Sequence, residues 1–324
     1  MAGMKPYLAG LLLALTMLAG GCGPPPAPSP DARETVSLWV TRDFGEEILF
    51  SSDLEMAPGQ SVLALLQAHL EVETAYGGGF VNAINGLESG FSGENGGEGS
   101  QMVDWFYYVN GILSSQGAGD YIPGSGDVIW WDYRPWGDIA FTPAVVGAFP
   151  QPFVNGYMGK DPGISILAGD GCGELAEQLA GFLGGQGAAD IEVAAYREED
   201  AVNRSRMTIV VAPWDQLHQS PFWAGIQQHR DRTGWFAELT PREFYPLDAE
   251  GRPSGPGYGE KAGAVLATGT GLGDPHPLWL VTGTDADGLA GALEALITQP
   301  EAFKKAVGAL VVDGDVIRVP RNTP

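Results

Sequence analysis

Cysteine is almost absent from this chain, which has only Cys22 and Cys172 among its 324 residues. Two cysteines cannot form a disulfide framework, and neither a CxxC nor an HExxH motif occurs, so the usual signs of a zinc site are missing. The four histidines are scattered along the chain, at His69, His218, His229 and His276. We therefore predict no metal site.

Positive charge is also scarce, because 17 lysines and arginines stand against 40 aspartates and glutamates, giving a formal net charge of −23. Such a chain is repelled by the phosphates of nucleic acids and by anionic lipid headgroups. We expect no nucleic-acid partner and no electrostatic binding to a membrane surface. The surplus of acid also favours solubility, a role that needs no specific partner.

Apolar runs long enough to span a bilayer, which takes roughly 20 residues, are missing as well. The N-terminal run Leu8–Leu18 is shorter, follows Lys5 and leads into small residues, a pattern typical of secretory signal peptides. The end of this segment, Ala19–Cys22, resembles the bacterial lipobox, in which a signal peptidase cuts before a cysteine that then carries lipid. Residues 1–22 are therefore interpreted as a lipoprotein signal peptide; an ordinary signal peptide or a short membrane anchor are the alternatives.

A Pro/Ser-rich segment, residues 23–34, follows the proposed lipidation site and predicts a tether. Lipid on Cys22 would anchor the protein in the bacterial cell membrane, with the folded part facing the extracytoplasmic side. The length of the remaining chain predicts two domains, residues 35–143 and 163–324, joined by a linker over residues 144–162.

The first predicted domain has the element order of an α+β, β-grasp-like fold. Alternating and aromatic-rich runs predict strands, and Ser61 is a suitable N-cap for an amphipathic helix. The predicted elements are the strands Val36–Val40, Glu46–Phe50, Phe80–Ile84, Trp105–Asn110 and Val128–Tyr133 and the helix Val62–Leu70.

The second predicted domain alternates strands with helices, which is typical of an α/β layered fold with a partly parallel sheet. The predicted strands are Ile164–Ala168, Ile191–Ala195, Met207–Ala212, Ala264–Thr268 and Leu278–Thr282. The predicted helices are Glu174–Gly184, Ala286–Ile297 and Pro300–Val307, followed by a hairpin over Leu310–Val319 with an Asp313-Gly314 turn.

Aromatic side chains are concentrated between Asp104 and Trp136. In the strand Trp105–Asn110 successive side chains point to opposite faces, so large rings lie on both. One helix can cover only one face of a small sheet, and the other face is therefore exposed or has a partner. An uncovered aromatic face predicts a binding surface; the alternative is that both sets of rings build core.

The same stretch resembles the C-terminal β-domain of transcobalamin and intrinsic factor, the vitamin B12 carriers, and the transcobalamin-like domains of bacterial secreted and lipid-anchored proteins. The resemblance covers about residues 35–136. The matching pieces, in order, are the helix after Pro58-Gly59, the aromatic strand ending in Val109-Asn110-Gly111, Gln116-Gly117, Asp120-Tyr121, Pro123, and Gly126-Asp127 before the last strand.

This resemblance implies that the ligand is cobalamin or another corrinoid. The positions that it nominates for contact with the ligand are Trp105, Phe106, Tyr107, Tyr108, Asn110, Ser114, Gln116, Gly117, Gly119 and Tyr121. The animal carriers hold the vitamin against an all-helical barrel, and nothing in this chain resembles that barrel. The second domain or a partner protein would then supply the opposing surface, or the fold has been kept without the ligand.

The second domain offers weaker signals. The turn Gly169–Gly173 opens a helix, so its amides could hold an anion, although a tight connection explains it equally. Cys172 at this helix start could have a lowered thiol pKa. Aromatic residues flank His218 and His229, at Trp214, Phe222, Trp223, Trp235 and Phe236. No nucleophile–base or paired-carboxylate arrangement is evident, and we predict that the protein is not an enzyme.

The sequence is thus interpreted as that of a surface lipoprotein that captures cobalamin or a related corrinoid and delivers it to a membrane transporter. One alternative is an interaction module that binds proteins or glycans without corrinoid. Another is a secreted hydrolase with its active site in the second domain.

Overall fold

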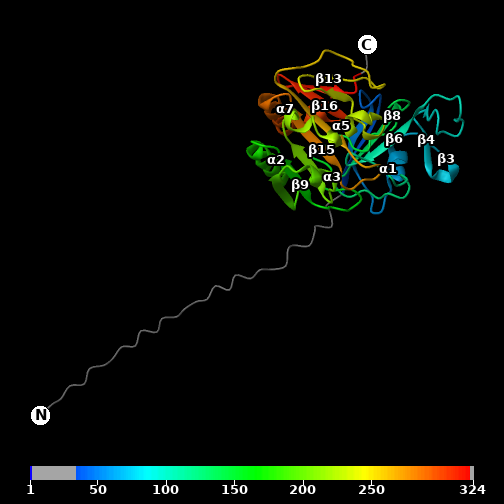
Figure 1. The fold of residues 1–324 in the computed structure, drawn as a ribbon. Helices are drawn as coiled ribbons and strands as arrows, with labels where there is room; N and C mark the ends of the chain where they lie inside the picture. The colour runs from blue at the N-terminus through cyan, green and yellow to red at the C-terminus, as the bar shows by residue number, and fades with distance from the viewer. Residues whose placement is uncertain (2–33, 322–324) are drawn as a thin grey trace. The chain divides into compact units, whose positions relative to one another are not determined.

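The structure is a computed structural model that describes Met1 and residues 34–321. The predicted signal peptide apart from Met1, the proposed lipidation site Cys22 and nearly all of the predicted tether lie outside the described residues. Residues 33–324 form one unit, and the fold is mixed α/β with a β-rich N-terminal half and a partly parallel sheet in the C-terminal half (Figure 1).

The N-terminal half is built on a five-stranded sheet of order β2-β1-β8-β6-β7, in which β1 and β8 are parallel and the other neighbours antiparallel. A second, three-stranded sheet has the order β3-β4-β5. The elements are β1 (Thr35–Arg42), β2 (Glu47–Glu55), α1 (Val62–His69), β3 (Val72–Ala75), η1 (Tyr76–Gly78), β4 (Phe80–Ile84), β5 (Leu87–Glu88), β6 (Val103–Val109), β7 (Ile112–Leu113) and β8 (Val128–Pro135).

Helix α1 covers one face of the five-stranded sheet. Its first turn is capped by Ser61, whose side chain accepts a hydrogen bond from the Ala64 amide at 3.2 Å. Its buried side chains share a core with alternate residues of β1, because alternate side chains of a strand point to the same face. The three helix residues are Val62, Leu65 and Leu66, and their β1 partners are Val36, Leu38 and Val40.

The C-terminal half is built on a seven-stranded sheet of order β10-β9-β11-β15-β14-β16-β17. The first four strands are parallel, and the rest are antiparallel. The strands are β9 (Ile164–Ala168), β10 (Ile191–Ala195), β11 (Met207–Val211), β14 (Ala262–Thr268), β15 (Leu278–Gly283), β16 (Gly308–Val312) and β17 (Asp315–Val319), with a separate hairpin of β12 (Ala237–Leu239) and β13 (Phe244–Pro246).

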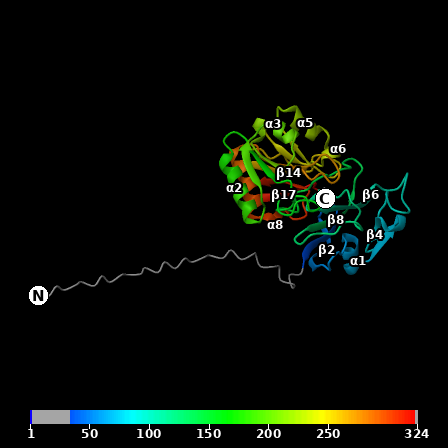
Figure 2. The same ribbon diagram turned by 90° about the horizontal axis from the view of Figure 1, so that it is seen from below.

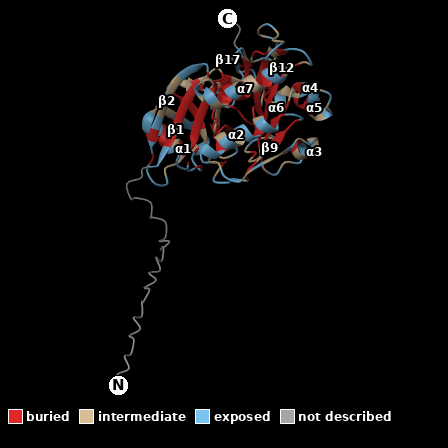
Figure 3. Ribbon diagram, turned by 90° about the vertical axis from the view of Figure 1, so that its left-hand side faces the viewer, coloured by how far each residue is buried: buried red, intermediate tan, exposed pale blue. Residues whose placement is uncertain are grey.

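The helices lie on both faces of this sheet, whose strands are mostly buried (Figures 2 and 3). One face is covered by α2 (Gly173–Gly185) and α7 (Ala286–Thr298), and α8 (Pro300–Phe303) follows α7. The other face carries the short helices α3 (Glu198–Val202), α4 (Trp214–Leu217), α5 (Pro221–Gln228) and α6 (Arg230–Thr233) and the β12–β13 hairpin.

The two halves share a hydrophobic core. Trp39, Tyr108 and Trp130 of the N-terminal sheet belong to the same buried cluster as Val210 and Trp214 of the C-terminal half. The segment expected to be a linker contributes to the packing, since seven of its hydrophobic side chains are buried: Ala144, Val145, Val146, Ala148, Phe149, Phe153 and Tyr157.

The sequence predicted strands β1, β2, β4, β6 and β8 of the N-terminal half, all seven strands of the C-terminal sheet, and the long helices α1, α2 and α7. The short strands β3, β5 and β7 were not predicted. The Asp313-Gly314 turn has the left-handed backbone at both positions, as expected for a tight hairpin. The predicted helix over Pro300–Val307 is wrong beyond Phe303, where α8 ends and Lys304 leaves the helical conformation with a ψ of 131°. The short helices α3 to α6 and the strands β12 and β13 were not predicted either.

Among the described residues, no helix is long and apolar enough to cross a membrane. The same part of the chain contains no group of three or more His, Cys, Asp or Glu side chains placed to hold a metal ion.

Candidate ligand-binding slot

A small pocket of about 190 Å³ opens on the face of the N-terminal sheet that carries α1. We call it the aromatic slot. Its lining residues are Leu63, Gly78, Gly79, Phe80, Val81, Trp105, Tyr107, Gly117, Ala118, Gly119 and Trp131. They come from α1, the η1–β4 segment, strands β6 and β8, and the loop after β7.

One wall of the slot is a pair of stacked rings. Tyr107 and Trp131 are directly opposite each other on β6 and β8, and their rings stack with centroids 4.6 Å apart and an interplanar angle of 17°. Trp105, two residues before Tyr107, lies on the same face and its indole N–H donates to the Leu87 carbonyl at 2.9 Å. The wall is therefore held rigidly by cross-strand pairing.

The mouth of the slot is formed by backbone. Gly117 and Gly119 are exposed, and a Cβ built on Gly119 would approach nothing closer than Leu63 Cδ2, at 3.8 Å. The missing side chains leave room for a ligand to reach the rings, and a larger residue at position 119 would project into that space.

The residues from Leu113 to Tyr121, here called the site loop, are tied to the stacked wall. The Tyr107 hydroxyl donates to the Gln116 carbonyl and accepts a hydrogen bond from Ser114 Oγ at 2.8 Å. The Ser114 amide donates to the Tyr107 carbonyl at 3.0 Å. Burial raises the pKa of Tyr107 to about 12, so its hydroxyl stays protonated and keeps donating at neutral pH.

The C-terminal half supports the start of the site loop. The Gly273 amide donates to the Leu113 carbonyl at 2.8 Å. Gly273 has a φ of +67°, and a Cβ placed on it would lie 2.2 Å from Ser115 Oγ. The Ser115 amide in turn donates to the Tyr157 hydroxyl at 3.1 Å.

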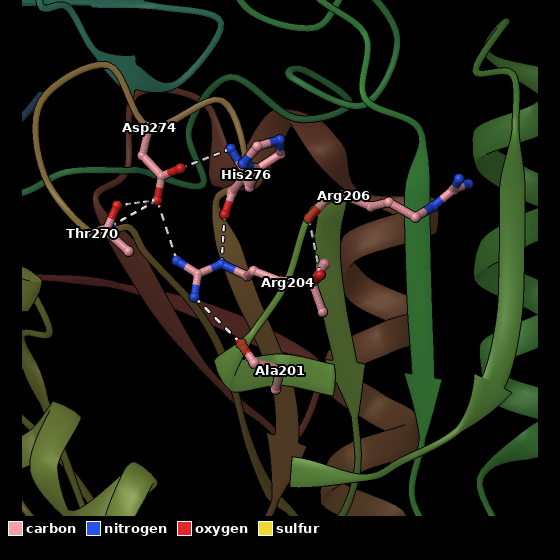
Figure 4. A network of polar contacts seen from close by, with 7 residues as sticks. Ala201, Arg204, Arg206, Thr270, Asp274 and His276 are labelled. Carbon is pink, nitrogen blue, oxygen red and sulfur yellow. Dashed lines mark hydrogen bonds and ion pairs between the residues drawn. The ribbon is translucent and has the colours of Figure 1, made fainter. Parts of the chain in front are cut away.

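Gly273 belongs to the loop between β14 and β15, which is closed by a buried ion pair (Figure 4). Arg204 donates to Asp274 Oδ2 at 3.2 Å and to the carbonyl of His276, and both charged side chains are 7% exposed. Asp274 also accepts from the amide and hydroxyl of Thr270, at 2.8 and 2.9 Å. Burial acts to raise the pKa of Asp274. The pKa nevertheless lies below its ordinary value, because the carboxylate is stabilised by the Thr270 hydrogen bonds, by a hydrogen bond from the His276 amide and by the Arg204 charge.

The structure brings four of the nominated residues together at the slot, namely Trp105, Tyr107, Gly117 and Gly119. Ser114 and Gln116 lie directly behind Tyr107 as its hydrogen-bond partners. These six therefore form one local arrangement.

Phe106 and Tyr108 point to the opposite face of the sheet, which the C-terminal half covers. Tyr108 is fully buried, and its hydroxyl accepts a hydrogen bond from the buried Arg134 at 2.6 Å. The Arg134 guanidinium also lies 4.6 Å from the Phe106 ring centroid. The aromatic face that the sequence left open therefore packs against the protein's own second half.

Asn110 and Tyr121 are bound to a buried carboxylate. Asp127 accepts from the Asn110 amide at 2.8 Å and from the Tyr121 hydroxyl at 2.6 Å. The second N–H of the Asn110 side-chain amide donates to the Gly156 carbonyl at 2.9 Å. The side-chain oxygen of Asn110 accepts a hydrogen bond from the Val128 amide. Both side chains thus act within the protein, where they fix the ends of the site loop and of β8.

Sequence reasoning missed part of the slot. Trp131 lies in the aromatic-rich stretch but is not among the nominated residues, and its stacking on Tyr107 follows from a strand pairing between residues 24 positions apart. Leu63, Phe80 and the Gly78-Gly79 pair were not considered. The run Gly77–Gly79 is the signal that could have found this wall, because glycine is common where the backbone approaches a ligand closely.

The candidates in the C-terminal half are mostly structural. The expectation of a lowered Cys172 thiol pKa is wrong: burial, then the charges of Asp170 and Asp215, raise it. In the Gly169–Gly173 turn, three of the amides offered to an anion are occupied: that of Gly169 donates to the Val211 carbonyl, that of Asp170 to Gln216 Oε1 and that of Cys172 to the Gly169 carbonyl. Four of the aromatic residues around His218 and His229 are buried in the shared core: Trp214, Trp223, Trp235 and Phe236.

A polar cleft of about 430 Å³ lies beside the ion pair of Figure 4. Arg204 and Arg206 both line it, but both are engaged by the protein. Arg206 donates to Asp190 Oδ2 at 2.9 Å and to the Ile164 carbonyl at 3.1 Å. Arg204 and Arg206 therefore stabilise the strands and loops around the cleft.

Residues 59–134 match the model of a family described as a domain of unknown function (DUF4430). No curated protein matches the chain. The matched segment runs from just before α1 almost to the end of β8, and every residue that lines the aromatic slot lies within it.

Proposed function

We propose that this protein is a bacterial surface lipoprotein that binds cobalamin or a related corrinoid and passes it to a membrane transporter. In this proposal it is a binding protein and not an enzyme. Lipid on Cys22 anchors it to the extracytoplasmic face of the cell membrane, and residues 23–34 hold the folded part away from the bilayer.

The N-terminal half is proposed to be a β-grasp domain of transcobalamin type. In support, a hairpin (β1–β2) is followed by a helix, and the last strand, β8, returns beside β1 in parallel orientation. The family that matches residues 59–134 is associated with transcobalamin-like proteins.

The observation that carries the proposal is the aromatic slot itself. It is a concave site with flat aromatic walls and a glycine-lined mouth, and it contains four of the residues nominated by the resemblance to the B12 carriers. Its volume of about 190 Å³ is below the roughly 300–1,000 Å³ of pockets that enclose drug-sized ligands. In the proposal the slot therefore grips one peripheral group of the corrinoid, while most of the ligand lies outside it.

Calorimetric titration of the full-length protein in detergent with cyanocobalamin tests this function. We expect submicromolar binding, which a Gly119→Leu substitution weakens at least about tenfold by filling the mouth of the slot. The matched control is Gly181→Leu, at an exposed glycine of α2 with nothing within 4 Å of a Cβ, which should bind like the wild type. Heat-silent titrations of folded wild-type protein would end the corrinoid proposal.

The anchor is tested separately by a Cys22→Ala substitution. We expect the wild type to incorporate labelled fatty acid and the variant to incorporate none, because the Cys22 thiol is the proposed site of lipid attachment. Labelling of the variant, or no labelling of the wild type, would contradict the lipoprotein proposal without bearing on ligand binding.

A second candidate function is glycan binding. The small volume of the slot favours it, since an apolar cavity of about 150 Å³ holds a single six-membered ring. Binding of a mono- or oligosaccharide that is lost in Gly119→Leu, together with no response to cyanocobalamin, would support this alternative.

A further inference from the structure

The C-terminal half touches the site loop at one residue whose lack of a side chain is essential. Gly273 makes a backbone hydrogen bond to Leu113 and lies so close to Ser115 that a Cβ would be 2.2 Å from Oγ and 2.7 Å from the Ser115 Cβ. Its φ of +67° also favours glycine. This position is therefore constrained twice, by backbone conformation and by its neighbour.

The loop that presents Gly273 is itself held firmly. Asp274, the next residue, is bonded by Thr270, His276 and Arg204, and its ion pair with Arg204 is almost fully shielded from water (Figure 4). Removing one partner of a buried ion pair strongly destabilises a protein, because the other charge is left buried without compensation. The loop therefore presents Gly273 from a fixed position.

The contact continues from Ser115 to the slot. Ser114, the preceding residue, donates to the Tyr107 hydroxyl, and Tyr107 in turn donates to the Gln116 carbonyl and stacks on Trp131. A displacement of Ser115 would therefore move the groups that hold the stacked wall and the mouth of the slot.

We propose that Gly273 is a positioning residue for the aromatic slot: the C-terminal half serves the binding site by fixing the site loop through Gly273, Ser115 and Ser114. The inference concerns the site of the proposed function, and its effect on affinity rests on that function. The structural part of the inference, which concerns the position and mobility of the site loop, does not rest on the proposed function.

The test is a Gly273→Ala substitution, compared with Gly314→Ala. Gly314 has a similar left-handed backbone, with a φ of +84°, but nothing lies within 4 Å of its Cβ. Both variants bear the strain of alanine in this conformation, and only Gly273→Ala displaces Ser115. Hydrogen exchange of the amides of residues 113–117 and titration with cyanocobalamin are measured on the full-length protein.

We expect Gly273→Ala to speed exchange in the site loop and to weaken cyanocobalamin binding, each by about tenfold, while Gly314→Ala leaves both within about twofold. The double variant Gly273→Ala/Ser115→Gly removes the two closest atoms and leaves the Tyr157 hydroxyl, at 3.2 Å, as the atom nearest the new Cβ, so it should restore exchange to near the wild-type rate. A general loss of stability would not be rescued in this way.

The proposal is overturned if Gly273→Ala changes site-loop exchange no more than Gly314→Ala does, or if Ser115→Gly fails to rescue it. If wild-type protein binds no cyanocobalamin, the proposed function fails, and the exchange data alone decide whether Gly273 positions the loop. If exchange responds as expected while affinity is unchanged, the link between loop and binding is overturned.

Discussion

At the scale of single residues, Tyr107 connects the stacked wall of the slot to the site loop. Its ring packs on Trp131, and its hydroxyl both donates to Gln116 and accepts from Ser114. A phenol has one proton to donate and lone pairs to accept, so one side chain satisfies both requirements. Phenylalanine could supply the ring contact but not the two hydrogen bonds.

Tyr107→Phe is expected to reduce stability at neutral pH by about 0.5–1.5 kcal/mol, the usual net value of a buried hydrogen bond. It should also alter alkaline unfolding. Burial raises the pKa of Tyr107 from 10.0 to about 12, so the unfolded chain loses this proton first. The stability it contributes is therefore fully present below about pH 10 and is lost as the pH rises towards about 12.

Urea unfolding at several pH values between about 9 and about 11.5 checks this prediction. The wild type should lose stability more steeply than Tyr107→Phe over this window, by the slope of one titrating proton. Parallel curves for the two proteins would mean that the Tyr107 proton is not linked to folding.

At the scale of elements, helix termini and loops fix the layers on which the slot depends. Helix α7 packs on β14, β15 and β16 and buries Leu289, Leu293 and Leu296. Its N-cap, Asp285, accepts from the Gly288 amide at 2.7 Å and from the Lys261 amide at 2.9 Å. One carboxylate therefore caps the helix and also ties it to the start of β14.

Asp285→Ala should destabilise the protein by about 1–2 kcal/mol, because it leaves the cap amide and the Lys261 amide without their acceptor. Asp285→Asn keeps one acceptor oxygen and should lose less than half of that amount. Thermal or urea unfolding measures both. Equal losses in the two variants would show that charge, and not the capping geometry, accounts for the effect.

At the scale of the whole described fold, the two halves depend on each other for their cores. Tyr108 and Trp130 are buried by residues of the C-terminal half, in a cluster that also contains Trp214. Close contact between the halves also needs a glycine, Gly45, where a Cβ would lie 1.9 Å from the carbonyl oxygen of Lys305.

Gly45→Ala should therefore destabilise both halves together. The left-handed φ of +83° costs roughly 1–2 kcal/mol for alanine, and overpacking against Lys305 adds about 1–3 kcal/mol. Gly314→Ala, with the same backbone strain and open space, should show only the first cost. Far-UV circular dichroism and tryptophan fluorescence should give one coincident unfolding transition in both variants; two separate transitions would contradict a shared core.

Much of the fold was predictable because its signals are local. Alternation over Val36–Val40, the cap at Ser61 and the Asp313-Gly314 turn each involve residues within a few positions of one another. The region from Trp214 to Pro246 was not predictable, because its helices have only four to eight residues and its strands three, too few for a period to show.

The candidate site was predictable in part. The alternation of β6 correctly puts Trp105 and Tyr107 on one face and Phe106 and Tyr108 on the other. It does not say which face a second layer covers, and the nominations therefore included both. Likewise, nothing near Asn110 in the sequence announces that its amide is bonded to Asp127 and to Gly156, 46 residues away.

The sequence by itself therefore determined the elements and the concentration of aromatic residues, because backbone period, capping and turn chemistry act between near neighbours. Only the tertiary structure decided that one aromatic face is buried core, that the other forms the slot, and that Gly273 lies against the site loop. Those outcomes depend on contacts between residues far apart in the chain, such as Gly273 and Leu113, which are about 160 positions apart. Packing of this kind is set by the assembled layers and leaves no periodic trace in the sequence.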